Sequence, residues 1–202
     1  MPEKKLPLPM RPDGPMGRPF AMLMERMNAP AYEAVLSALQ PGPGDALLEI
    51  GFGTGDFLRR AARRMKHGRL AGVDPAPLMV EMATRRLRSL APRFTLELRE
   101  ADAGTLDWPP ASFNAVAAIH SFQFWNDPEA SLRTIRTLLK PGGKLCLSLR
   151  QHGATPPDWL PNPLSKAPDE TARLIALLGA CGFIAPHQVE AEPRAVLVMA
   201  GA

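Results

Sequence analysis

The hydrophobic positions follow a helical spacing near the start of the chain, and short apolar runs then alternate with amphipathic stretches. Between residues 30 and 40, the positions at helical intervals are Tyr32, Val35, Leu36 and Leu39. The Pro-Gly-Pro-Gly run that follows predicts the end of this helix. Buried strands are expected at 46–50, 70–74, 95–99, 115–119 and 144–149. Helices are expected at 56–65, 77–89, 128–139 and 169–181.

This alternation predicts a three-layer α/β sandwich. Strands that are separated by helices form right-handed β-α-β units, which place the strands parallel in one sheet with helices on both faces. After the last helix, two apolar runs at 184–190 and 195–199 are joined by only a short segment. That segment is too short for a crossover, so we expect the two runs to form an antiparallel hairpin. The sequence thus predicts a mostly parallel seven-stranded sheet with a C-terminal antiparallel hairpin.

Proline-rich stretches and the absence of long apolar runs define the domain organisation. Six of the 23 prolines lie in residues 1–19 and five lie in 156–168, which predicts an N-terminal arm and a long loop. We expect the arm to cover residues 1–30 and a single domain to cover 31–202. No apolar run reaches the roughly 18 residues that a transmembrane helix needs, and no secretion signal is recognisable. The expected location is the cytoplasm.

Composition and charge exclude several classes of protein. Cys146 and Cys181 each lie in an apolar run, which predicts buried, reduced thiols instead of a disulfide framework. The formal net charge is +4, and arginines are concentrated at 59–69 and 85–88. A nucleic-acid surface is one interpretation, but no aromatic side chains interleave with these arginines. We therefore favour two amphipathic helices with solvated basic faces.

A glycine-rich loop follows the first predicted strand. Gly51, Gly53 and Gly55 occupy alternate positions, so the backbone there can adopt positive φ and a ligand can approach the bare main chain. A nicotinamide dinucleotide fingerprint reads G-x-G-x-x-G, whereas the third glycine here comes one residue early. Asp56 stands where that fingerprint requires glycine, and we expect its charge to repel a pyrophosphate. Both features argue against an NAD-linked reductase.

Acidic residues mark the ends of three successive predicted strands. These residues are Glu49, Asp74 and Asp102. A carboxylate at the end of the second strand can accept hydrogen bonds from both hydroxyls of a ribose. Taken alone, Asp74 is equally compatible with capping the helix that begins near residue 77. The three acids together favour a ligand site at the carboxyl edge of the sheet.

These motifs, with Val73-Asp74-Pro75 and the Leu-Leu-Lys-Pro-Gly-Gly run at 138–143, resemble those of class I S-adenosylmethionine-dependent methyltransferases. The chain is most similar to the small methyltransferase domains of ubiquinone and menaquinone biosynthesis. The resemblance extends over residues 32–200 in order. It implies a Rossmann-like seven-stranded fold. It also implies that the cofactor is S-adenosyl-L-methionine and that the product is S-adenosyl-L-homocysteine.

The resemblance also implies roles for individual residues. The glycine loop would pass under the methionyl part of the cofactor, with Glu49 near the amino group. Asp74 would bind the ribose hydroxyls, and Pro75 and Met79 would line the adenine. The adenine amino group would bond Asp102 beside the backbone N–H of Ala103. Acidic strand ends suit this ligand, because its ammonium and sulfonium groups are cationic.

The acceptor side of the site is expected after the fourth predicted strand. His120 is the best candidate for a general base, although a neutral histidine contacting cofactor or backbone is the alternative. His152 is a weaker second candidate. An apolar acceptor wall is expected from Phe122, Phe124 and Trp125, unless some of these rings are core. No cluster of residues has metal-ligand spacing, so no metal cofactor is expected.

An apolar lid is expected over the acceptor. It would consist of the loop at 153–168 and a methionine-rich part of the arm with Met16, Phe20, Met22, Met24 and Met27. We predict methylation of a small, apolar or aromatic metabolite and do not expect a nucleic-acid partner. The sequence leaves the oligomeric state open. The alternatives are methylation of RNA or protein through the basic helices, and a non-catalytic subunit that only binds S-adenosylmethionine.

Overall fold

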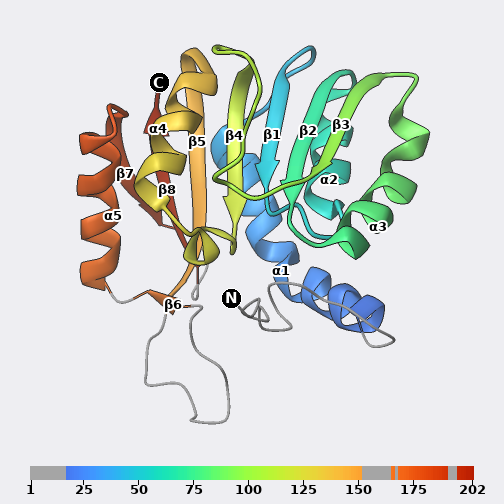
Figure 1. Ribbon diagram of the computed structural model, residues 1–202, viewed down its shortest axis with the longest axis horizontal. Helices are drawn as coiled ribbons and strands as arrows, with labels where there is room; N and C mark the ends of the chain where they lie inside the picture. Colours follow the sequence, from blue (N-terminus) through green and yellow to red (C-terminus); the bar gives the residue numbers. More distant parts are fainter. Residues whose placement is uncertain (1–16, 152–164, 167, 191–194) are drawn as a thin grey trace, which may run out of the picture.

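A computed structural model describes residues 17–151, 165–166, 168–190 and 195–202, and it has the predicted α/β architecture (Figure 1). The long strands are β1 (Ala46–Ile50), β2 (Gly68–Asp74), β3 (Phe94–Glu100), β4 (Phe113–Ile119), β5 (Leu139–Gln151), β7 (Ile184–Glu190) and β8 (Ala195–Gly201). The α-helices are α1 (Gly17–Leu39), α2 (Asp56–Met65), α3 (Pro77–Leu87), α4 (Pro128–Leu138) and α5 (Pro168–Ala180). Two short 3₁₀ turns, η1 (Arg88–Leu90) and η2 (Phe122–Phe124), follow α3 and β4.

The sheet topology confirms the prediction from connection lengths. The strand order is β3-β2-β1-β4-β5-β8-β7. The pairs from β3 to β5 are parallel, whereas β8 is antiparallel to both β5 and β7. A two-residue strand, β6 (Ser165–Lys166), also pairs with β5 and was not predicted. Two residues carry no readable period, so this element could not be recognised from the sequence.

The core lies on both faces of the sheet. Helices α4 and α5 cover one face, and α1, α2 and α3 cover the other (Figure 1). Strand β1 is buried along its whole length, with Leu47 and Leu48 packing on opposite faces. Cys146 and Cys181 are buried free thiols, as predicted, and burial raises the pKa of Cys146 to about 12. None of the helices in the described part of the chain is long and apolar enough to span a membrane.

Helix α1 differs from the prediction, because it begins at Gly17 and contains Pro30. Proline removes one helical hydrogen bond and displaces the preceding turn, which bends a helix. Figure 1 shows the consequence: the second part of α1 rises behind the sheet, and the first part lies across the edge where the parallel strands end. The expected boundary at residue 30 falls at this bend. Met16, residues 153–164 and residue 167 of the expected lid lie outside the described residues, and so does the second candidate base, His152.

Candidate functional site

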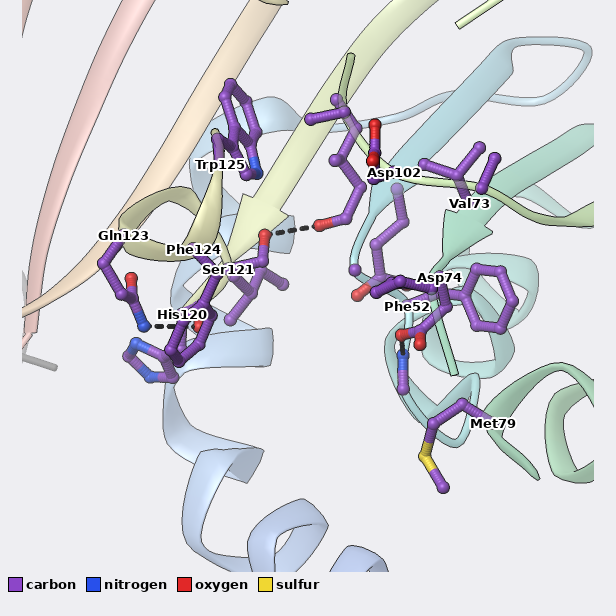
Figure 2. Close-up of a pocket in the computed structure, with 18 of the residues that line it drawn as sticks. Phe52, Val73, Asp74, Met79, Asp102, His120, Ser121, Gln123, Phe124 and Trp125 are labelled. Carbon is purple, nitrogen blue, oxygen red and sulfur yellow. Dashed lines mark hydrogen bonds between the residues drawn. The ribbon is translucent and has the colours of Figure 1, made fainter. Parts of the chain in front are cut away.

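A cavity of about 440 Å³ opens at the carboxyl ends of β1, β2, β3 and β4. Its lining brings together most of the residues singled out in the sequence: Glu49, Gly51, Gly53, Asp74, Pro75, Met79, Asp102, Ala103, His120, Phe124 and Trp125. Figure 2 shows Asp74 and Met79 on one side, with His120 and Phe124 on the other. Parallel strands gather their ends at one edge, which is why residues so distant in sequence share this cavity.

The glycine loop forms the floor of the cavity, and its glycines serve different purposes. A Cβ on Gly51 would lie 2.5 Å from the Cβ of Ser121, so the close approach of β1 and β4 requires glycine there. Gly53 has φ of +53°, and a Cβ there would meet no atom within 4 Å, which leaves its backbone open to a ligand. Gly55 is not in the lining, because it packs against Ala83 of α3.

Asp74 is buried and already accepts two backbone hydrogen bonds. One carboxylate oxygen accepts from Gly53 N at 2.8 Å (Figure 2), and the other accepts from Ala76 N at 2.9 Å. Burial raises the pKa of Asp74 to about 6, and the two backbone hydrogen bonds moderate the rise. These bonds fix the carboxylate at the cavity wall, where its remaining lone pairs can accept hydroxyl groups.

Glu49 and Asp102 supply two further carboxyl groups. Glu49 is 2% exposed, and none of the described side chains or backbone groups hydrogen-bonds its Oε2. Burial raises the pKa of Glu49 well above its usual value, and the nearby charges of Asp74 and Asp56 raise it further. Asp102 is exposed, and its Oδ1 accepts from Gly104 N at 2.7 Å. A cationic ligand group near Glu49 would relieve the cost of ionising this buried carboxyl.

Asp56 does not act as the sequence suggested. It is buried outside the cavity lining, and Arg60 Nε donates to its Oδ2 at 2.7 Å. Burial alone would raise the pKa of Asp56, but the hydrogen bonds from Arg60 and Arg59 outweigh burial and lower it. Its charge is therefore compensated locally. The carboxyl groups in the lining would repel an anionic ligand instead. Among its described residues, the lining includes no lysine or arginine.

The segment after β4 forms the opposite wall. His120 has φ of +53°, in the left-handed region, its N–H donates to Ser148 O at 2.9 Å, and its carbonyl accepts from Gln123 Nε2 at 2.7 Å. Phe124 and Trp125 line the cavity, whereas Phe122 packs into the core beside Trp125 and borders a separate, smaller hollow. The aromatic wall therefore contains two of the three predicted rings.

The first part of α1 covers the cavity. Phe20 and Met24 line it, whereas Met22 and Met27 are 53% and 57% exposed on the outer side of the helix. The helix also contributes four lining residues that sequence analysis did not assign to the site: Ala21, Glu25, Asn28 and Tyr32. Tyr32 had been assigned only to a helix face, because a 3.6-residue spacing does not say which turn meets a cavity.

A polar contact fastens this part of α1 to the glycine loop and to α3. Glu25 Oε2 accepts from Thr54 Oγ1 at 2.7 Å and from Arg86 Nη1 at 2.8 Å. Arg86 Nη1 also donates to Thr54 Oγ1 at 2.9 Å. Glu25 and Thr54 both line the cavity, so this three-residue contact joins its cover to its floor.

Comparison of the sequence with models of known protein families identifies the family of this chain. The family model described as "Methyltransferase domain" matches residues 48–147, which run from β1 through most of β5. The chain belongs to the class I S-adenosylmethionine-dependent methyltransferases. S-adenosylmethionine is therefore its expected methyl donor, and the acidic lining and the open backbone at Gly53 are compatible with that cationic ligand.

Two of the similar proteins are themselves named methyltransferases. It is 32% identical over 182 residues to nocamycin O-methyltransferase of Saccharothrix syringae, covering 82% of this chain and 63% of the relative. It is 33% identical over 101 residues to demethylmenaquinone methyltransferase of Deinococcus radiodurans, covering 50% of this chain and 41% of that relative. The chain thus spans less than two thirds of either protein.

The fold comparison agrees with the family. A methyltransferase structure from Aquifex aeolicus superposes with a TM-score of 0.72 at 18% identity, covering 88% of this chain and 92% of the other. At that identity the likeness concerns the fold alone. The predicted resemblance to methyltransferases, and to the menaquinone branch at a distance, is confirmed. Among the described residues, no group of three or more His, Cys, Asp and Glu side chains is arranged to hold a metal ion.

Proposed function

We propose that this methyltransferase transfers a methyl group from S-adenosylmethionine to a small apolar or aromatic metabolite, without a metal cofactor. The observation that carries the proposal is the character of the wall around His120. Phe124 and Trp125 contribute rings from the segment after β4, and Phe20 and Met24 contribute apolar groups from α1. Such a wall suits a hydrophobic acceptor, with polar groups reserved for orienting it.

The proposed cofactor contacts follow the positions at the strand ends. Asp74 binds the ribose hydroxyls through the lone pairs that its two backbone bonds leave available. Pro75 and Met79 line the adenine, and Asp102 with the Ala103 N–H binds its amino edge. The glycine loop and Glu49 receive the methionyl end. When bound, the cofactor supplies a methyl group that its sulfonium already activates for displacement.

The chain's own contribution is then positioning, exclusion of water and removal of a proton. Holding an acceptor in line can contribute roughly 7–11 kcal/mol in favourable systems. We infer that the first part of α1, which lines the cavity, limits access of water to the reacting atoms. His120 accepts the proton when the acceptor atom is a hydroxyl or a similar acid, a role that typically contributes about 10² to 10⁴ in rate.

A macromolecular acceptor fits less well. Several arginines of the basic helices are engaged with acidic partners: Arg60 and Arg64 with Glu33, and Arg86 with Glu25. These pairs reduce the charge available to a phosphate backbone, on which nucleic-acid affinity mostly depends. We therefore expect no salt-dependent retention of RNA at moderate ionic strength.

The first experiment is calorimetric titration of the protein with S-adenosylhomocysteine, with NADH in parallel. Micromolar binding of the first compound and none of the second supports the proposed cofactor site. Phenols, hydroxyquinones and apolar carboxylic acids are then screened as acceptors. Formation of S-adenosylhomocysteine from S-adenosylmethionine is the measured signal. Absence of S-adenosylhomocysteine binding would contradict the proposed function, and NADH binding would contradict the exclusion of dinucleotides.

The role of His120 is tested by His120→Asn, because asparagine tolerates the left-handed backbone at this position. We expect turnover of a screened acceptor to fall about 100-fold or more, and affinity for S-adenosylhomocysteine to change less than about threefold. His187→Asn, on the edge strand β7, is the matched control. Equal losses of turnover and affinity would assign His120 to cofactor binding instead of catalysis.

A further inference from the structure

Backbone N–H groups around the cavity are bound by the chain's own carboxylates. Such groups, in loops and at the starts of helices, are the usual anion-binding donors at the carboxyl edge of an α/β sheet. Asp74 accepts from Gly53 N at 2.8 Å and from Ala76 N at 2.9 Å. Asp102 accepts from Gly104 N at 2.7 Å. A carboxylate or phosphate that entered the cavity would therefore find these donors engaged.

Asp127 extends this arrangement to the aromatic wall. It is the N-cap of α4, its Oδ1 accepts from Ala130 N at 2.9 Å, and it lines the cavity two residues after Trp125. A helix start favours negative charge, because its free N–H groups carry partial positive charge. Here an exposed carboxylate of the chain already occupies that position beside the wall proposed for the acceptor.

The charges of the lining do not balance. Among its described residues, the lining includes no lysine or arginine but five carboxyl groups, those of Glu25, Glu49, Asp74, Asp102 and Asp127. Arg86 compensates Glu25 from outside the lining, at 2.8 Å. S-adenosylmethionine carries one net positive charge, from an ammonium, a sulfonium and a carboxylate, so it offsets one of the remaining acids. An acceptor that arrives after the cofactor therefore meets a net negative surface.

We propose that the acceptor carries no negative charge: the site takes uncharged or cationic apolar metabolites and rejects carboxylates and phosphates, and Asp127 determines this selectivity. The inference rests on the proposed function and specifies the charge class of its acceptor. Beside Phe124 and Trp125 an anion would lose hydration without gaining a cationic partner. A hydroxyl or amine would instead donate hydrogen bonds to the carboxylates nearby.

The experiment compares two fluorescent ligands on protein saturated with S-adenosylhomocysteine. N-phenyl-1-naphthylamine is uncharged, whereas 8-anilinonaphthalene-1-sulfonate has the same rings and one sulfonate. We expect the wild-type protein to bind the uncharged ligand at least tenfold more tightly, and equal affinities would overturn the proposal. Phe124→Ala should weaken the uncharged ligand at least threefold. Unchanged affinity in that variant would also overturn the proposal, because the ligand would then lie outside the aromatic wall.

Asp127→Asn isolates the effect of the charge, because asparagine is also a good N-cap. We expect this variant to bind the sulfonate at least threefold more tightly than wild type does and the uncharged ligand within twofold. Asp45→Asn is the matched control, since Asp45 Oδ2 accepts from Gly42 N at 2.7 Å just before β1, at the opposite edge of the sheet. No gain in Asp127→Asn, or an equal gain in the control, would contradict the assignment.

Turnover provides the same comparison. In the acceptor screen, 4-hydroxybenzoate is paired with 4-hydroxybenzamide, and the amide should have a kcat/KM at least tenfold higher. Faster methylation of the carboxylate would overturn this inference and leave the proposed function intact. Failure of the wild-type protein to bind S-adenosylhomocysteine would instead contradict the proposed function itself.

Discussion

At the scale of single residues, the candidate site contains a buried carboxyl group, Asp74, whose ionisation lowers the stability of the fold. The pKa of Asp74 is raised from its ordinary value of 3.8 to about 6 because the carboxylate is buried. A folded-state pKa above the unfolded value means that the ionised group destabilises the fold. That cost is present at neutral pH and disappears as the pH falls through 6 toward 4. The gap corresponds to about 3 kcal/mol, before the ligand compensates any of it.

Asp74→Asn should therefore separate binding from stability. The substitution removes a buried charge but also one of two backbone hydrogen bonds, so these opposing effects should leave the unfolding free energy at pH 7.5 within about 1–2 kcal/mol of wild type. Affinity for S-adenosylhomocysteine should fall at least tenfold. Denaturant unfolding and calorimetry measure the two quantities. Asp107→Asn, at an 80% exposed carboxylate, is the control. Retained affinity would refute the ribose contact.

The pH dependence of binding should follow from the same group. In the proposed complex, ribose hydroxyls donate to the ionised carboxylate, so a bound ligand should lower the pKa of Asp74 and binding near pH 6 should release a proton. We expect affinity for S-adenosylhomocysteine to weaken about tenfold between pH 7.5 and pH 5. Glu49 also titrates above its usual range, so Asp74→Asn must remove the step near pH 6 for the assignment to hold. Titrations in buffers of different ionisation enthalpy count the protons released.

At the scale of elements, α1 joins two segments that differ in how far their side chains are buried. After Pro30 the helix is anchored by Val35 and Leu36, which are fully buried. Before Pro30 it presents Met22, Leu23 and Met27 to solvent at more than half exposure. It is held there by Ala21, which is buried in the core, by Glu25 and by an exposed ion pair between Arg18 and Glu81 of α3. The bend at Pro30 thus separates a fully buried anchor from a more exposed segment beside the cavity.

Glu25→Gln should loosen this cover. The substitution removes the charge that pairs with Arg86 but keeps an oxygen for Thr54. Because charge-assisted hydrogen bonds contribute about 1.5–3 kcal/mol, we expect dissociation of S-adenosylhomocysteine to be at least about threefold faster. Stopped-flow displacement measures this rate.

Glu81→Gln makes the same change in the exposed pair with Arg18, and it should alter the dissociation rate less than twofold. Similar rates in the two variants would show that Glu25 does not control opening.

At the scale of the whole molecule, the sequence predicted what periodicity and loop length determine. The strands, their parallel order and the C-terminal hairpin follow from apolar runs and connection lengths, and the strand ends then bring the acidic residues together. The compensation of Asp56 was also readable, since Arg59 and Arg60 stand at helical spacing from it.

Other features depended on contacts that no local pattern records. Phe122 and Phe124 were grouped as one wall, but they lie in a 3₁₀ turn, where nearby rings point to different sides. The helical structure before Pro30 was not predicted, because the proline was interpreted as the start of a helix. In the structure it lies inside α1, at the bend. Which face of α1 meets the cavity depends on Thr54 and Arg86, which are distant in the chain.

Tyr32 is the only tyrosine in the chain, and it lies in the cavity wall. Protein grown on 3-fluorotyrosine would therefore carry one fluorine, and its NMR spectrum would contain a single resonance from the wall of the site. Ligand occupancy then becomes visible without a substitution and without a known acceptor. A library of candidate metabolites can be sorted by which compounds shift that one line.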